Sequence, residues 1–67
     1  MKLLDVVALT EDLPQKDLCK GQVGTIVEQL APQMYEVEFS GRDGKTYATA
    51  AVSEKLLIRL IHEPADA

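Results

Sequence analysis

Several residue types are scarce in this sequence. Its 67 residues include no tryptophan, one cysteine, one histidine, two tyrosines and one phenylalanine. A single cysteine excludes an internal disulfide, on which small secreted domains usually depend. No hydrophobic run approaches the roughly 18 residues of a membrane-spanning helix, and Asp5 interrupts the N-terminal segment before a signal-peptide core can form. These absences predict a soluble, cytoplasmic protein that is complete as given.

The groups that catalysis and metal binding require are also missing. His62 stands near the C-terminus as an isolated imidazole without a partner group. Cys19 has no second cysteine with which to bind a metal, so packing within a loop is a simpler role for it than nucleophilic attack. No pairing of nucleophile with base, or of acid with base, is visible. We therefore expect a protein that is not an enzyme and needs no cofactor.

The composition is that of a folded domain. Hydrophobic residues make up 46% of the chain and charged residues 27%, which is a globular balance. The length suffices for one domain and is too short for two. Eleven acidic and seven basic residues give a net charge of −4, which weighs against general attraction to nucleic acid or anionic membranes. We predict a single domain over residues 1–62 and a frayed tail over 63–67.

Short apolar segments separated by turn residues predict an all-β fold. The clearest strand is 34–40, where Tyr35, Val37 and Phe39 alternate with polar residues. The pair Asp43-Gly44 follows it and predicts a tight hairpin into an antiparallel fourth strand. A long loop occupies 10–20. The five strands are expected at 4–9, 21–30, 34–40, 46–52 and 56–61.

The second of these strands carries special backbone requirements. Gly21 and Gly24 indicate a tight turn at its start and a close approach of another backbone. Ile26 and Val27 cannot both face one core, so the strand needs a bulge or a core on each side.

A short connection at 31–33 would place Glu28 opposite Glu36, with Glu38 two residues further on. Like charges in this arrangement repel each other. The three side chains are either an acidic patch that recruits a basic partner or an ordinary solvated face.

Residues 53–61 allow two interpretations. Alternation of Leu56, Ile58 and Leu60 fits a strand that follows a brief turn, whereas a helix capped by Ser53 would also collect apolar residues on one side. The strand fits a five-stranded sheet better.

As a strand, this segment would project Leu57 and Ile61 opposite to its other apolar residues, so both of its faces would be hydrophobic. Either Leu3 and Leu4 pack over the second face, or the face contacts a partner or a second subunit.

The most specific stretch of the chain is Gly-Gln-Val-Gly-Thr-Ile-Val-Glu at 21–28. It is accompanied by Asp-Val-Val-Ala-Leu at 5–9 with Leu-Pro at 13–14, by Tyr-Glu-Val-Glu-Phe at 35–39, and by Asp-Gly-Lys-Thr at 43–46. With these segments the chain resembles, over residues 3–60, a family of short bacterial proteins known as domain-of-unknown-function family 4926.

The resemblance implies a small five-stranded SH3-like barrel with a long loop between strands one and two. It implies no activity, cofactor or catalytic residue. Members of the family sometimes occur beside a toxin-like neighbour, which suggests an accessory or antitoxin-like role. The chain departs from the expected pattern at 48–51, where small residues stand in place of bulky ones. The core is either thinner there or filled by another surface.

In such a barrel the long loop would present Glu11, Asp12 and Asp17, at the place where SH3 domains offer acidic residues to basic, proline-rich peptides. Those peptides dock on an aromatic-lined groove, and the aromatic residues for one are lacking. We therefore predict a protein-binding module that uses Leu57 and Ile61 on the last strand, supported by the acidic loop, with self-association.

The alternative is a nucleic-acid-associated barrel. Lys20, Arg42 and Lys45 could form a basic patch at one end of it. RNA recognition needs exposed aromatic residues beside basic ones, and the acidic balance of the chain opposes it. Nucleic acid is thus the less favoured partner.

Overall fold

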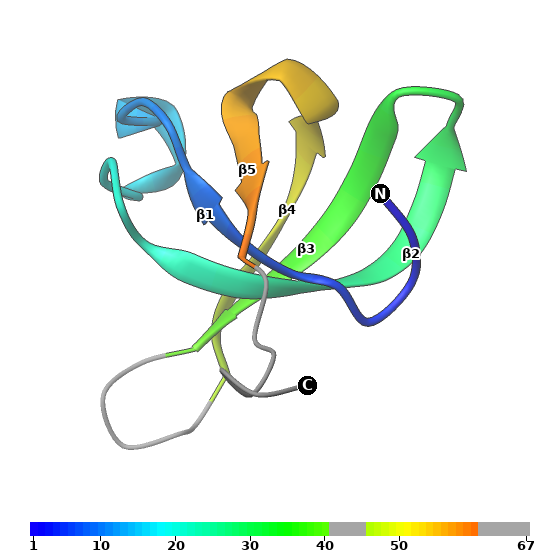
Figure 1. The fold of residues 1–67 in the computed structure, drawn as a ribbon. Coiled ribbons are helices and arrows are strands. Elements are labelled where there is room, and N and C mark those ends of the chain that lie inside the picture. Colours follow the sequence, from blue (N-terminus) through cyan, green and yellow to red (C-terminus); the bar gives the residue numbers. More distant parts are fainter. Residues whose placement is uncertain (41–45, 61–67) are drawn as a thin grey trace, which may run out of the picture.

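The computed structural model describes residues 1–40 and 46–60, with side chains in the second segment from residue 48 onward. Within these residues the regular structure consists of five β-strands and two single 3₁₀ turns (Figure 1). The prediction of an all-β protein is confirmed. The elements in chain order are β1 Val6–Leu9, η1 Pro14–Lys16, β2 Val23–Ala31, β3 Met34–Ser40, β4 Thr46–Ser53, η2 Glu54–Leu56 and β5 Leu57–Arg59.

The five strands form one antiparallel sheet in the order β4-β3-β2-β1-β5. The edge strands β4 and β5 are consecutive in the chain and are joined only by η2. Because three residues cannot span a flat five-stranded sheet, the sheet must curl until its two edges approach each other. Among the described residues β4 and β5 do not pair, so the sheet is curled but not closed. This arrangement is compatible with the expected SH3-like barrel.

The centre of the sheet follows the predicted alternation. Tyr35, Val37 and Phe39 are buried on the concave side of β3, where they form the core together with side chains from every other strand. On β2, Ile26 lies in this core, while Val27 is 41% exposed at a break in the pairing register with β3. The strand contains a bulge, one of the two alternatives considered, and Val27 does not share the core with Ile26. Val27 points outward by the ordinary alternation of a strand, and the bulge turns the next residue, Glu28, to the same outer side and helps the strand to bend.

Small residues on both sides make room for Phe39. Gly24 lies opposite Phe39 on β2, and Ala48 lies opposite it on β4. A Cβ atom on Gly24 would come within 2.8 Å of the Glu38 carbonyl oxygen, which confirms the predicted close backbone approach. Gly21 has a φ of +87°, as the predicted turn requires. The large side chain on β3 thus fills the space that the small residues of β4 leave.

The last segment is a 3₁₀ turn followed by a strand, so the strand interpretation is confirmed. Its predicted orientation is wrong. Leu57 is only 6% exposed and belongs to the core, whereas Ile58 is 55% exposed. Leu57 pairs with Leu9 of β1, and both side chains point inward. The alternation of apolar residues defined two faces but did not indicate which of them the turn η2 would direct into the core.

The N-terminal segment, one of the two predicted covers for the second face of the last strand, does not pack there. Leu3 and Leu4 are both exposed, so they do not bury themselves over the last strand. Instead, the backbone N–H of Leu4 donates to the Ile26 carbonyl, which attaches this segment to β2. Other predictions concern parts outside the described residues, namely the hairpin at Asp43 and Gly44, the basic residues Arg42 and Lys45, Ile61, His62, and the tail at 63–67.

In the part of the chain that the structure describes, none of the helical segments has the length and hydrophobicity of a membrane span.

Candidate functional site: the outer face of the sheet

The outer face of β1 carries apolar side chains although this strand also contributes to the core. Val7 and Leu9 are buried inside, so Ala8 between them points outward. Ala8 pairs with Val23 on β2 and with Ile58 on β5. These two neighbours shield Ala8 and are themselves 45% and 55% exposed. The three residues form one apolar row across three strands.

A second row lies beside the first. Val6 pairs with Thr25 on β2, and its carbonyl accepts a hydrogen bond of 2.8 Å from the backbone N–H of Leu60. Leu60 is 39% exposed. The two rows together make a continuous hydrophobic surface, which we call the apolar face. Its residues are Val6, Ala8, Val23, Ile58 and Leu60.

Acidic side chains adjoin this face on the same side of the sheet. Glu28 and Glu36 are cross-strand partners, as the sequence predicted, and Glu38 pairs with Thr25 at the end of the second apolar row. Because the neighbouring residues on β3 point into the core, Glu36 and Glu38 point outward, and Glu28 points to the same side as its cross-strand partner Glu36. Within residues 1–40 and 46–60, no salt bridge neutralises any of the three. We call Glu28, Glu36 and Glu38 the acidic rows.

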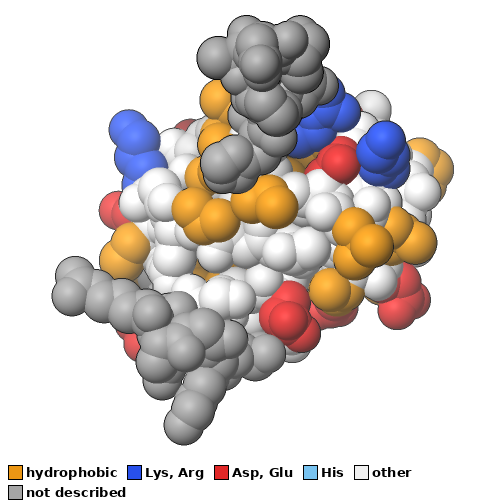
Figure 2. All heavy atoms as spheres, turned by 60° about the horizontal axis from the view of Figure 1, so that its bottom comes forward, with side chains coloured by type: hydrophobic (Ala, Val, Ile, Leu, Met, Phe, Trp, Pro, Cys, Tyr) orange, Lys and Arg blue, Asp and Glu red, His pale blue; other side chains and the backbone are white. Residues whose placement is uncertain are grey.

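Figure 2 shows the side of the molecule that is turned downward in Figure 1, where β1 and β2 sweep across the lower part of the fold. Hydrophobic side chains gather in its centre and towards its right side. Acidic side chains lie along the lower edge, directly beside hydrophobic ones. On this side of the molecule hydrophobic and acidic side chains therefore lie next to each other, and basic side chains lie along the upper part of the view.

Most of the apolar face could not be predicted from the sequence of the last strand alone. The pairing of β1 with both β2 and β5 adds Val6, Ala8 and Val23 to the exposed residues of the last strand. In β1, Val6 and Ala8 alternate with the core residues Val7 and Leu9, and this pattern was a signal that the strand is apolar on both sides. That signal could be interpreted only once the neighbouring strands were known.

The predicted acidic loop is an ordered structure that packs on the core. The Leu13 and Leu18 backbones form an isolated bridge, and the Leu18 side chain is buried. An Asp12 Oδ1 atom accepts a 2.7 Å hydrogen bond from the backbone N–H of Lys20. Cys19 is exposed, so the expectation that it packs within the loop is wrong; Leu18 takes that role. Lys20, expected in a basic patch, thus stands next to a carboxylate, which opposes a phosphate contact at this point.

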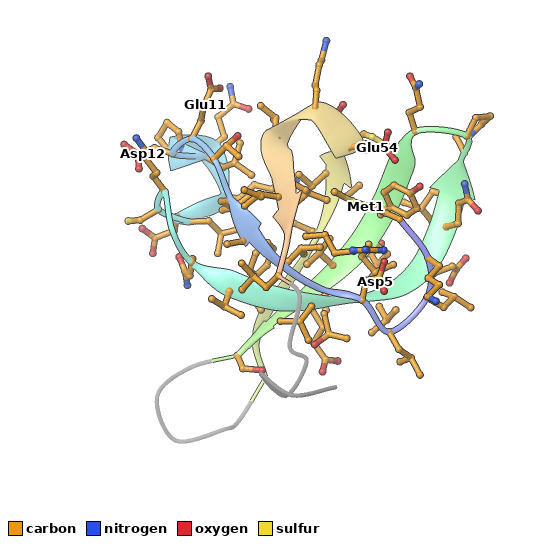
Figure 3. All side chains as sticks on the ribbon, viewed as in Figure 1. Met1, Asp5, Glu11, Asp12 and Glu54 are labelled. Carbon is orange, nitrogen blue, oxygen red and sulfur yellow. The ribbon has the colours of Figure 1, made fainter. Side chains whose placement is uncertain are left out.

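The other two acidic residues of the loop have different environments. Glu11 is exposed, and Figure 3 shows it with Asp12 at the opposite end of the molecule from Asp5. Asp17 adopts a left-handed conformation with a φ of 58° at the end of η1, which Asp tolerates better than most residues. The structure therefore places the neighbouring residues Glu11 and Asp12 at one end of the molecule, away from Asp5.

An open groove of about 530 Å³ lies at another end of the fold, lined by Met1, Gln33, Ser53, Glu54, Lys55 and Leu57. Beside it, the Tyr35 hydroxyl donates to the Met1 carbonyl at 3.3 Å and to Glu54 Oε1 at 3.1 Å. Figure 3 shows Met1 and Glu54 lying near each other there. Burial raises the pKa of Tyr35, and the hydrogen bond and negative charge of Glu54, with a smaller effect of Asp5, raise it further. The phenol is held protonated and ties the N-terminal segment to β3 and η2.

Because of Tyr35, the free energy of unfolding should decrease at alkaline pH. Its folded-state pKa lies above the unfolded value of about 10. Its contribution to stability is therefore complete below that value and is lost as the pH rises through the folded-state pKa. In urea denaturation at a series of pH values, the free energy of unfolding should fall more steeply above about pH 10 for the wild type than for Tyr35→Phe.

Glu54→Gln is the matched control for this experiment. It removes the charge beside Tyr35 and leaves the burial of the ring, so it should remove only part of the alkaline dependence. Parallel curves for the wild type and Tyr35→Phe would contradict the assignment.

In the described segments no group of His, Cys, Asp or Glu side chains could hold a metal ion. The fold and surface define a small all-β protein with a curled five-stranded sheet whose outer face is part apolar and part acidic. The chain matches the family described as Domain of unknown function (DUF4926) over residues 3–59, and it belongs to this family. No curated protein and no solved structure matches the chain significantly.

Proposed function

We propose that this protein is a non-catalytic, cytoplasmic protein-binding module that recognises a partner segment in which apolar residues adjoin basic ones. The observation that carries the proposal is the apolar face beside the acidic rows. Exposed hydrophobic surface that is contiguous across strands marks contact sites more often than isolated exposed residues do. The neighbouring glutamates favour a partner with lysine or arginine next to its hydrophobic residues.

The energetics favour a moderate affinity. Covering the exposed parts of Val23, Ile58 and Leu60 would contribute about 1 kcal/mol each, given about 2–3 kcal/mol for complete burial of such side chains. A sum of about 3 kcal/mol corresponds to roughly a hundredfold in the dissociation constant. The acidic rows would add specificity and a faster association rate more than affinity. Such a module fits a reversible accessory protein, including the antitoxin-like role that the family resemblance suggests.

Two synthetic peptides test the proposal. One alternates leucine with lysine, and the other alternates leucine with glutamate. In an NMR titration, the lysine peptide should bind and shift the backbone amide signals of β1, β5 and the start of β2, and the glutamate peptide should not bind. Ile58→Ser combined with Leu60→Ser should weaken binding about tenfold or more, because it removes apolar contact area.

Leu4→Ser is the matched control, because Leu4 is an exposed leucine outside the apolar face. It should leave binding unchanged. The proposal would be wrong if both peptides bound equally, if Leu4→Ser weakened binding as much as the double variant, or if the shifts mapped elsewhere. Generic RNA titrated over a salt series is a further control. Binding to RNA with a steep loss of affinity on adding salt would favour the nucleic-acid alternative.

A further inference from the structure

The edge strand β4 lacks the features that usually protect a sheet edge. It is eight residues long and contains neither a charged residue nor a proline. Within the described residues it pairs with β3 only. The opposite edge, β5, has three residues and carries Arg59. Short length and charge are the common means by which proteins prevent edge strands from pairing with other chains. Within the described residues one edge of this sheet is therefore protected, and the other lacks both a paired strand and these protective features.

The pairing register shows which backbone groups of β4 are free. The Glu54 N–H donates to the Gln33 carbonyl at 2.9 Å, next to the pair Met34 and Ser53. In an antiparallel ladder, this bond makes Met34 and Ser53 a non-hydrogen-bonded pair, and the two kinds of pair alternate along the strands. It follows that Thr49 and Ala51 direct their N–H and C=O groups away from β3. Among the described residues these groups have no backbone partner, and we call them the free edge.

We propose that β4 pairs through this edge with β4 of a second copy of the chain, antiparallel and centred on Ala50. The pairing sets Thr49 of each copy opposite Ala51 of the other. Both residues then exchange the N–H and C=O groups that β3 leaves unused. The two five-stranded sheets become one continuous sheet. This interface is separate from the apolar face and does not depend on the proposed function.

Charge and size favour a second copy as the occupant. Thr49 and Ala51 carry small, uncharged side chains, so the symmetric pairing brings neither a clash nor like charges together. Glu36 and Glu38 stand on β3, one strand further in. The two β3 strands would lie three strand spacings apart, about 14 Å, which exceeds the screening length of about 8 Å at physiological salt. The acidic rows of the two copies would therefore not oppose the contact. Because only one strand from each copy takes part, we expect weak association that depends on concentration.

Sedimentation equilibrium over about 10 µM to 1 mM tests the pairing. The average mass of the wild type should rise towards that of a dimer, and amide exchange at Thr49 and Ala51 should slow as the concentration rises. Ala51→Pro removes one outward N–H and leaves the β3 ladder intact, as proline on an edge strand can. It should weaken association at least about tenfold. Ala51→Thr keeps the N–H and should dimerise like the wild type.

Ala51→Lys is a second variant in case the proline disturbs the fold; it adds charge at the edge and should also be monomeric. A wild type that stays monomeric at every concentration would overturn the proposal, as would dimerisation of both the proline and the lysine variants. If Ile58→Ser with Leu60→Ser abolished the dimer instead, the apolar face would be the contact between copies. If a dimer formed without slower exchange at Thr49 and Ala51, β4 would not be the contact.

Discussion

Phe39→Ala should lower the free energy of unfolding by about 3–5 kcal/mol, the usual range for removing a buried aromatic side chain. Phe39 is fully buried on the central strand β3 and lies between Gly24 and Ala48 on the adjacent strands. Neither small neighbour can extend into the cavity left by the ring. Because 67 residues correspond to a total stability of only about 3–10 kcal/mol, much of the variant should be unfolded at room temperature.

Urea denaturation followed by circular dichroism measures this loss. Phe39→Leu is the matched control, since it keeps an apolar side chain in place and should be clearly less destabilising. A loss below about 1 kcal/mol for the alanine variant would mean that the core collapses around the cavity. In that case Phe39 would not be the centre of the packing.

Gly24→Ala should destabilise the fold by a different mechanism, namely steric overlap. The new Cβ would lie 2.8 Å from the Glu38 carbonyl oxygen, 2.8 Å from Val37 Cγ1 and 2.9 Å from Phe39 Cδ1. The backbone oxygen cannot rotate away, so β2 must separate from β3. Overpacking of a core costs about 1–3 kcal/mol and sometimes more. We expect a loss at the upper end of this range, measured by the same denaturation experiment.

Gly21→Ala separates steric overlap from backbone conformation. A Cβ at Gly21 would meet no atom within 4 Å, but the residue has a φ of +87°. Its replacement should cost about 1 kcal/mol, the usual strain of an alanine in a left-handed conformation. If the two alanine variants were equally destabilised, close packing would not be the reason for glycine at position 24.

Local patterns in the sequence were sufficient for much of the fold. The alternation in 34–40 identified β3 and its buried side. The two glycines located a turn and a close approach of strands, and the consecutive residues Ile26 and Val27 indicated that one of them leaves the core, as Val27 does. The pairing of Glu28 with Glu36 followed from a short connection between their strands. Each of these inferences concerns residues close together in the sequence, where strand periodicity and turn chemistry dominate.

The sequence by itself thus determined that the chain is an all-β protein of the DUF4926 family with an acidic outer surface on β3. Only the tertiary structure decided that Leu57 belongs to the core, while Ile58 joins Ala8 and Val23 on the outside. The physical reason is that the last strand is apolar on both sides, so its own periodicity cannot choose between them. The choice is made by the pairing of β5 with β1, two strands that are distant in the sequence.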